Sequence, residues 1–434
     1  MARFKPHSTA PVPERAILVG VDLGRSEWSC DDSLAELSRL AETNGAEVVL
    51  TMKQRLDAPV PKTFIGKGKV EELVSAVRGL GADVVIFDDE LTPSQQANLE
   101  RLVGEPVKII DRTALILDIF GVHARTHEGR LQVQLAQLQY VLPRLRGMWS
   151  HLVGEQTRGG IGSRFGQGES QLEVDRRLVR ARIATLRREL ERLKRRRAVQ
   201  SKARWDSGVW RVALVGYTNA GKSTLLNRLT GSDVYARDEL FATLDPTTRA
   251  LQLEEGRRIT ITDTVGFIQK LPTTLVESFK STLAEVRAAD LVLLVVDVSD
   301  PHRELEISAV RAVLEEIGAS DVRCVEVLNK SDLLDEPELR AAMAAHPNAQ
   351  VVSALDGSGV RGLLYRIARE AGEGSVSLTV LVPYEKGLLM KMVHERCQVM
   401  RESYVQEGLL ATVRADARMA ATLERYVVTD APEA

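Results

Sequence analysis

The stretch Gly216-Tyr217-Thr218-Asn219-Ala220-Gly221-Lys222-Ser223-Thr224 has the spacing G-x-x-x-x-G-K-S of a phosphate-binding loop, the P-loop. An apolar, β-branched run at 209–215 precedes it and suits a buried strand, whereas residues 224–229 suit a helix. The glycines let backbone N–H groups point at phosphate oxygens. A plain glycine turn would not require the lysine and the serine, so the full spacing favours a nucleotide phosphate site.

Four further segments follow the P-loop in the order expected of a guanine-nucleotide site. They are Phe241-Ala242-Thr243-Leu244-Asp245-Pro246-Thr247-Thr248, Asp263-Thr264-Val265-Gly266, Asn329-Lys330-Ser331-Asp332 and Ser353-Ala354-Leu355. Each segment alone is a weak or moderate signal. All of them in this order exclude most ATP-directed P-loop enzymes.

The N-K-x-D segment has the chemistry to distinguish guanine from adenine. The Asp332 carboxylate can accept hydrogen bonds from both N1–H and N2–H₂ of guanine, and adenine has no matching donors. The Lys330 stem can lie over the ring while Asn329 ties the segment to the P-loop. A backbone N–H of residues 353–355 can bind the guanine O6. We therefore expect GTP and GDP as ligands.

The phosphate end of the site predicts a Mg²⁺ ion and a γ-phosphate sensor. Ser223 and Thr243 are the expected Mg²⁺ ligands, Asp263 holds the ion through water, and the Gly266 N–H meets the γ-phosphate. Lys222, Thr243 and Gly266 are the residues expected to act in catalysis, by positioning and charge neutralisation. The predicted nucleotide site comprises Gly216 to Ser223, Phe241 to Asp245, Asp263 to Gly266, Asn329 to Asp332 and Ser353 to Leu355.

Phe267 follows Gly266, where many small GTPases carry a glutamine that orients the attacking water. A phenyl ring neither donates nor accepts hydrogen bonds in this role. We expect slow hydrolysis by the chain alone and acceleration by a partner that rearranges the site or supplies the missing group. The sequence does not single out a general base.

Composition and charge are those of a globular protein in a reducing compartment. Hydrophobic residues make up 44% and charged residues 27% of the 434 residues. Three widely spaced cysteines argue against a disulfide framework and a zinc site. The N-terminus shows no apolar signal segment, and the run 291–296 is too short to span a bilayer. We expect a cytoplasmic location without a transmembrane segment.

Two leucine-rich stripes predict an antiparallel helical hairpin. One runs through Leu131, Leu135, Leu138, Leu142 and Leu145, and the other through Leu172, Val179, Ile183, Leu186, Leu190 and Leu193. Residues 171–205 carry thirteen Lys or Arg against four Asp or Glu. Such a surplus favours contact with nucleic acid over a merely solvated helix face. The glycine-rich connector near 158–168 suits a probe of an RNA-rich cavity, although a tip without a role stays open.

Strands alternating with helices predict an α/β fold with a largely parallel sheet in the N-terminal part, and a βαββαβ-like order predicts a small α+β domain at the C-terminus. The expected last strand of that domain is 426–428. The expected domains are a disordered lead-in at 1–14, an N-terminal α/β domain at 15–121, a basic helical hairpin at 122–205, a Ras-like P-loop G domain at 206–374 and a ferredoxin-like domain at 375–434.

The sequence resembles the translation-factor class of GTPases and, within it, the HflX family of ribosome-associated GTPases. Besides the five GTPase motifs, the resemblance rests on Thr63 to Lys69, Asp111-Arg112-Thr113, Gly154-Glu155 through Gly168-Glu169-Ser170, and Phe241 to Pro246. It covers nearly the whole chain. It implies binding at the large ribosomal subunit, with the hairpin loop near the peptidyl-transferase centre, and a role in splitting or rescuing stalled ribosomes under stress.

The leading interpretation is therefore a Mg²⁺-dependent GTPase that acts on the large ribosomal subunit through ribosomal RNA contacts of the hairpin. Nothing in the sequence demands a dimer, and we expect a monomer. One alternative is a GTP-switched binding module for another RNA or protein complex, in which hydrolysis is incidental. Another adds a second purine-nucleotide site in the N-terminal domain, for which the sequence offers only glycine-rich turns.

Overall fold

A computed structural model of the chain describes most of the molecule. The described residues are 13–24, 27–148, 167–205, 209–232, 240–241, 243, 246–254, 257–270, 283–372, 376–415 and 417–428. The glycine-rich connector of the hairpin and the lead-in up to residue 12 lie outside them. The chain divides into two compact units, Met1–Glu189 with Lys270–Ser278 and Leu190–Gln269 with Phe279–Ala434.

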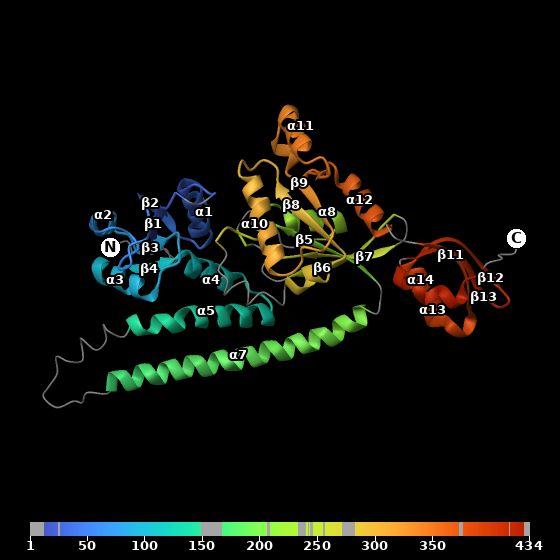
Figure 1. Ribbon diagram of the computed structural model, residues 1–434, viewed down its shortest axis with the longest axis horizontal. Helices are drawn as coiled ribbons and strands as arrows, with labels where there is room; N and C mark the ends of the chain where they lie inside the picture. Colours follow the sequence, from blue (N-terminus) through green and yellow to red (C-terminus); the bar gives the residue numbers. More distant parts are fainter. Residues whose placement is uncertain are drawn as a thin grey trace, which may run out of the picture. The chain divides into compact units, whose positions relative to one another are not determined.

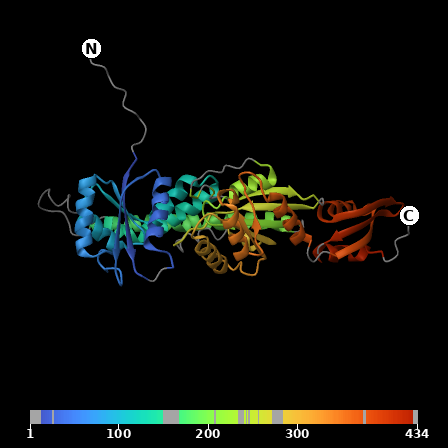
Figure 2. The same ribbon diagram turned by 90° about the horizontal axis from the view of Figure 1, so that it is seen from above.

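The first unit contains a parallel four-stranded sheet in the order β2-β1-β3-β4. Its strands are β1 (Arg15–Asp22), β2 (Glu47–Arg55), β3 (Val84–Phe87) and β4 (Lys108–Asp111). They alternate with the helices α1 (Cys30–Thr43), α2 (Lys67–Leu80), α3 (Pro93–Val103) and α4 (Arg112–His123). Figure 2 shows this sheet edge-on with helices packed on it. The predicted α/β fold with a parallel sheet is confirmed.

Local sequence signals set the helix starts in this unit. Thr92 forms a capping box with Gln95, in which each side chain bonds the backbone N–H of the other residue, and Pro93 occupies the first helical position. Asp111 ends β4 and also caps α4, because its Oδ1 accepts from the Ala114 N–H at 2.9 Å. One carboxylate therefore marks the carboxyl end of a strand and the start of the next helix.

The predicted hairpin consists of α5 (His127–Met148) and α7 (Gln167–Trp205), which run side by side in Figure 1. Leu131 and Leu135 on the first helix and Ile183 and Leu186 on the second are buried, as their spacing predicts. The other stripe residues whose burial the structure describes are only half-buried: Leu138, Leu142, Leu145, Val179, Leu190 and Leu193. The helical pair therefore has a short buried seam rather than a long coiled coil.

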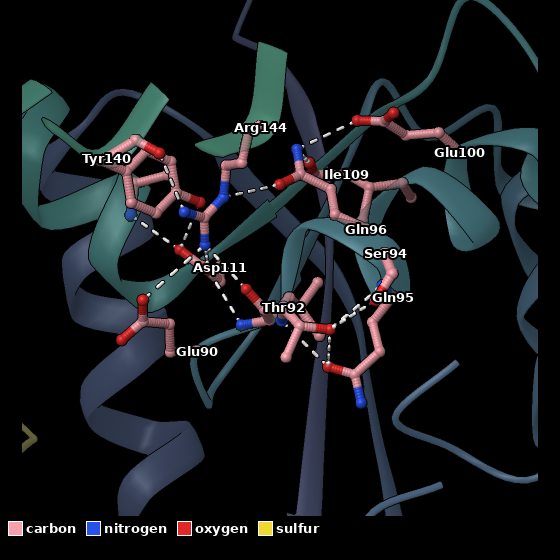
Figure 3. Close-up of polar contacts among 12 residues, drawn as sticks. Glu90, Thr92, Ser94, Gln95, Gln96, Glu100, Ile109, Asp111, Tyr140 and Arg144 are labelled. Carbon is pink, nitrogen blue, oxygen red and sulfur yellow. Dashed lines mark hydrogen bonds and ion pairs between the residues drawn. The ribbon is translucent and has the colours of Figure 1, made fainter. Parts of the chain in front are cut away.

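A polar network fastens the end of α5 to the sheet of the first unit (Figure 3). Arg144 donates to the Leu91 carbonyl at 2.7 Å and to Asp111 Oδ2 at 3.2 Å, and its guanidinium lies over the Tyr140 ring at 3.5 Å. The Tyr140 hydroxyl donates to Asp111 Oδ1 at 2.9 Å. Asp111 is fully buried and Arg144 is 9% exposed, so this ion pair is shielded from solvent.

The second unit contains a six-stranded sheet in the order β10-β9-β8-β5-β7-β6, in which only β6 and β7 pair antiparallel. Its strands are β5 (Trp210–Gly216), β6 (Thr247–Gln252), β7 (Arg258–Asp263), β8 (Leu291–Asp297), β9 (Cys324–Asn329) and β10 (Gln350–Val351). The helices are α8 (Lys222–Thr230), α10 (Arg303–Glu316), α11 (Glu336–Ala345), α12 (Val360–Gly372) and the 3-10 turn η1 (Ser331–Leu333). The strand that enters the P-loop is central and completely buried at 212–216.

The C-terminal part forms a three-stranded antiparallel sheet in the order β11-β13-β12. Its elements are β11 (Val376–Pro383), η2 (Tyr384–Lys386), α13 (Gly387–Arg396), β12 (Gln398–Val405), β13 (Gly408–Ala415), α14 (Ala417–Leu423) and η3 (Glu424–Tyr426). The predicted last strand at 426–428 is reduced to an isolated bridge. Tyr426 ends η3, Val427 forms an antiparallel bridge with Val380, and the Val428 N–H donates to the Thr379 carbonyl at 2.9 Å. A run of three residues after a helix is too short to fix a strand from sequence.

Within the described part of the chain, no helix is both long and apolar enough to cross a membrane.

The buried pair of Arg144 and Asp111 predicts a large effect of its removal. Arg144→Met would leave the Asp111 carboxylate without its cationic partner, and we expect the first unit to lose about 3–5 kcal/mol of unfolding free energy. Native-state hydrogen exchange at the amides of β3 and β4 measures this loss.

Arg182→Met is the matched control, since Arg182 is exposed and bonds only Gln134 at 3.1 Å among the described contacts. We expect it to change the stability by less than about 0.5 kcal/mol. Equal protection factors in both variants would contradict a stabilising role of the network.

Candidate nucleotide-binding site

The P-loop, residues 216–223, lies at the carboxyl end of β5 and leads into α8. Two of its glycines are required because neighbouring atoms lie too close to the backbone for a Cβ. A Cβ on Gly216 would lie 2.1 Å from the Val295 carbonyl oxygen, and one on Gly221 would lie 2.3 Å from Asn329 Nδ2. Gly221 also has φ +87°, a region that other residues rarely adopt. The motif glycines therefore let β8 and the Asn329 side chain touch the loop.

Lys222 is a buried ammonium group within the loop. Its Nζ donates to the Gly216 carbonyl at 3.1 Å and to the Tyr217 carbonyl at 2.6 Å. Burial lowers the pKa of Lys222 to about 8, even though the nearby carboxylates of Asp263 and Glu306 raise it. A phosphate group at the loop would favour the charged form of this lysine.

Ser223, Thr243 and Asp263 meet at the carboxyl end of β7. The Ser223 Oγ lies 2.8 Å from Thr243 Oγ1 and donates to Asp263 Oδ2 at 2.6 Å. Burial raises the pKa of Asp263, against the lowering effect of Lys222 and of hydrogen bonds from the two hydroxyl groups. The second oxygen, Oδ1, is buried without a hydrogen-bond partner in the described structure. Two hydroxyl oxygens and an unpaired carboxylate oxygen are hard ligands of the kind that Mg²⁺ prefers.

Asn329 joins the two segments that are expected to bind the base, 329–332 and 353–355, to the P-loop. Its Nδ2 donates to the Ala220 carbonyl at 2.8 Å, and its Oδ1 accepts from the Ala354 N–H at 3.0 Å. The Ser353 hydroxyl donates to Asp332 Oδ1 at 2.6 Å and orients that carboxylate. These contacts bring the three segments to one edge of the sheet, as expected from the carboxyl ends of parallel strands.

The segment after Asp263 packs against the P-loop. Gly266 approaches so closely that a Cβ there would lie 2.9 Å from the Thr218 Cα and 3.1 Å from Lys222 Nζ. Phe267 forms a parallel bridge with Tyr217, and both side chains are buried. Thr264 donates its hydroxyl to the Leu214 carbonyl at 2.7 Å, so that side chain supports the sheet.

Most predicted site residues are brought together, while some fall outside the described residues. Ala242, Leu244 and Asp245 lie outside them. Phe241 is 2% exposed with φ +59°, so its side chain packs inside the second unit. Leu355 is 72% exposed at the edge of the site.

Sequence reasoning missed three residues of this region. Asp297 forms an ion pair with Lys330 at 2.7 Å, and Arg228 donates to the Ala354 carbonyl at 3.1 Å. Gln269 donates its backbone N–H to the Tyr217 hydroxyl at 2.7 Å. Asp297 ends the buried strand β8, and that position could have identified it. Arg228 and Gln269 carry no comparable signal.

Among the residues with described placement, no group of three or more His, Cys, Asp and Glu side chains is arranged to hold a metal. A site built from hydroxyl groups, one carboxylate and nucleotide phosphates is a different type of site.

Three family models match successive parts of the chain. Residues 31–121 match the model described as GTP-binding GTPase N-terminal, residues 123–204 that described as GTP-binding GTPase Middle Region, and residues 211–330 that described as 50S ribosome-binding GTPase.

Curated relatives match over nearly the full length. GTPase HflX of Caldanaerobacter subterraneus subsp. tengcongensis is 45% identical over 417 residues, which cover 96% of this chain and 94% of the relative. GTPase HflX of Escherichia coli K12 is 42% identical over 397 residues, covering 91% and 92%. Among solved structures, a GTP-binding protein from the archaeon Sulfolobus solfataricus in complex with GDP is 24% identical with a TM-score of 0.42, covering 82% of this chain and 98% of that one.

The buried ammonium of Lys222 predicts a pH dependence of nucleotide affinity. Above a pKa of about 8 the lysine in the folded protein loses its proton, whereas in the unfolded chain it stays charged up to about 10.5. The unfolded state then binds more protons, so this group's contribution to stability rises with pH in that window. Nucleotide phosphates favour the charged lysine, so nucleotide binding takes up a proton in this pH range. The nucleotide affinity therefore falls as the pH rises.

We expect the Kd for GDP to rise about fourfold between pH 7 and 8.5, measured by titration at constant ionic strength. Lys222→Met serves as the control, because guanine itself titrates equally in both proteins. The variant should bind more weakly and lack the additional pH dependence. The same pH dependence in both proteins would exclude Lys222 as its source.

Proposed function

The chain belongs to the HflX family of GTPases, and we propose that this GTP-hydrolysing P-loop enzyme acts on the large ribosomal subunit. The single observation that carries the proposal is the match of residues 211–330 to the family described as 50S ribosome-binding GTPase. Its finer form is a cytoplasmic factor, monomeric in solution, that splits or rescues stalled ribosomes under stress.

The basic second helix of the hairpin supports a nucleic-acid partner. Between residues 173 and 196, where the structure describes burial, nine of its arginines and lysines are exposed: Arg177, Arg180, Arg182, Arg187, Arg188, Arg192, Lys194, Arg195 and Arg196. Glu191 pairs with Lys194 at a distance of 3.8 Å, which is a weak contact at the surface. Exposed cations along one helix neutralise phosphates and release counterions, so ribosomal RNA is the expected contact.

At the phosphates, the P-loop N–H groups and Lys222 neutralise charge, and Gly266 senses the γ-phosphate. Ser223 and Thr243 would ligate Mg²⁺, with Asp263 holding it through water. The observation that fits this ion is the unpaired Asp263 Oδ1 beside two hydroxyl groups. Bound Mg²⁺ would stabilise the negative charge on the diphosphate of the leaving GDP.

At the base, Asp332 accepts hydrogen bonds from guanine, and Lys330 covers the ring. The hydrogen bond from Ser353 orients the Asp332 carboxylate, and the ion pair with Asp297 holds the lysine in place. Because Asn329 joins these segments to the P-loop, base recognition and phosphate binding share one frame.

Recognition of guanine by the Asp332 carboxylate predicts that Asp332→Asn changes the nucleotide specificity. An amide presents a donor to at least one of the two guanine donors, so we expect the GTP affinity to fall at least tenfold and xanthosine triphosphate to become the better ligand. A competition titration with both nucleotides measures this. Asp335→Asn, which changes an exposed helix cap, is the matched control. Unchanged guanine selectivity would remove Asp332 from its role.

The proposed partner predicts ribosome-dependent turnover. We expect steady-state GTP hydrolysis to be slow for the chain alone and to rise at least tenfold with purified large ribosomal subunits at one fixed salt concentration. Raising the salt should weaken the stimulation, because phosphate contacts release counterions.

Small ribosomal subunits at the same concentration are the matched control. Tight GTP binding without stimulation by large subunits would leave the assignment as a GTPase intact and refute the ribosomal partner. The protein would then be a GTP-switched module for another complex.

A further inference from the structure

The chain after Gly266 is bonded to the P-loop by three backbone groups. The Phe267 N–H donates to the Gly216 carbonyl at 3.1 Å, and the Phe267 carbonyl accepts from the Thr218 N–H at 2.7 Å. The Gln269 N–H donates to the Tyr217 hydroxyl at 2.7 Å. The segment therefore follows the P-loop as an added piece of strand, and Tyr217 provides its last bond.

The Gln269 side chain at the end of this segment is buried but has no hydrogen-bond partner. It is 4% exposed, and neither Oε1 nor Nε2 has a partner in the described structure. A buried carboxamide without partners costs free energy that an apolar side chain of the same size would avoid. Folding of the described conformation therefore gives no reason for a glutamine at this position.

Other residues of the second unit also carry buried polar atoms without hydrogen-bond partners. Thr218 Oγ1 on the P-loop and Asp263 Oδ1 on β7 are also buried without partners in the described structure. Thr218 bonds Phe267 through its backbone, and Asp263 precedes Gly266 by three residues. These atoms belong to the elements expected to surround the γ-phosphate, where a ligand or a water would bond them.

Hydrolysis needs a group that orients the attacking water, and the two residues directly after Gly266 are apolar. Water attacks the γ-phosphorus, the bond to the bridging oxygen breaks with its electron pair passing to GDP, and the proton of the water passes to the released phosphate. A carboxamide can accept a hydrogen bond from the water and donate one to a phosphate oxygen. Phe267 and Ile268 cannot do so, and Gln269 is the first polar side chain after Gly266.

We propose that Gln269 is the water-orienting residue of this GTPase and that Tyr217 holds it back in the conformation described. When the bond from the Gln269 N–H to the Tyr217 hydroxyl breaks, the end of the segment moves and the carboxamide reaches the attacking water. This inference rests on the proposed roles of the P-loop and Gly266, and it does not require the ribosomal partner.

The test compares Gln269→Met with the parent chain in single-turnover GTP hydrolysis, with and without large ribosomal subunits. Methionine keeps the size and removes the polar atoms. We expect the Kd values for GTP and GDP to stay within twofold, the thermal unfolding midpoint to stay equal or rise, and the hydrolysis rate to fall at least tenfold. The additional binding of aluminium fluoride in the presence of GDP should also be lost.

Gln132→Met is the matched control, because Gln132 is likewise a buried glutamine but lies in α5 of the first unit. It should leave the rate unchanged. Tyr217→Phe should raise the basal rate several-fold, because the hydroxyl that holds the Gln269 N–H is gone. Gln269→Glu, which retains an acceptor, should be intermediate.

A Gln269→Met protein that is more stable yet hydrolyses GTP within twofold of the parent under both conditions would overturn the inference. A Tyr217→Phe protein with a lower basal rate at saturating GTP would overturn the restraining role of Tyr217. Absence of stimulation in the parent refutes only the ribosomal partner, since the ratio of variant to parent without subunits still decides about Gln269.

Discussion

The carboxamide of Asn329 is the interaction on which the nucleotide site depends. It donates to the Ala220 carbonyl and accepts from the Ala354 N–H, and it is 1% exposed. Both partners are backbone atoms of connecting segments, so this one side chain fixes the distance between the P-loop and the base-recognition segments. A Cβ at Gly221 would lie 2.3 Å from Asn329 Nδ2. The asparagine of one motif can therefore reach the P-loop only because the other motif has a glycine at this position.

Buried polar groups differ between two places in the molecule. In the first unit, Arg112 is 2% exposed and donates to Glu36, to Asp88 and to the Ser33 carbonyl, so the buried charge is paired with two carboxylates. In the second unit, Thr218, Asp263 and Gln269 keep buried polar atoms without partners in the described structure. Each such atom costs about 1–3 kcal/mol, which a stable fold tolerates where a ligand later supplies the partner.

The sequence predicts those parts of the molecule that depend on neighbouring residues. The alternation of strand and helix patterns predicts the elements of the first unit, and local signals such as the capping box of Thr92 and Gln95 set where a helix begins. The motif order placed the P-loop and the segment from Asn329 to Asp332 in one site, because the carboxyl ends of parallel strands lie at the same edge of a sheet. The bonds of Arg144 to Leu91 and Asp111 depend on how a helix docks on a distant sheet, and no local pattern encodes that.

The nucleotide site shows the same limit. The absence of a glutamine at position 267 is visible in the sequence, and it predicts slow hydrolysis. The burial of Gln269 and its bond to Tyr217 are not visible, because both depend on the pairing of residues 267–269 with the P-loop, which no short-range signal specifies. Sequence reasoning therefore identified what the site lacks and could not identify which side chain stands nearby.

The three bonds between residues 267–269 and the P-loop set a scale for the control of hydrolysis. Release of the Gln269 end breaks only the bond to the Tyr217 hydroxyl, and each such bond contributes about 0.5–1.5 kcal/mol net. Loss of one bond corresponds to a population shift of roughly 2- to 10-fold, and loss of all three, about 1.5–4.5 kcal/mol, to a shift of roughly 10 to 10³. An unpaired carboxamide favours the rearranged state, because it gains partners there. The opposing effects leave a balance of a few kcal/mol, which a macromolecular partner can reverse by binding one arrangement more tightly than the other.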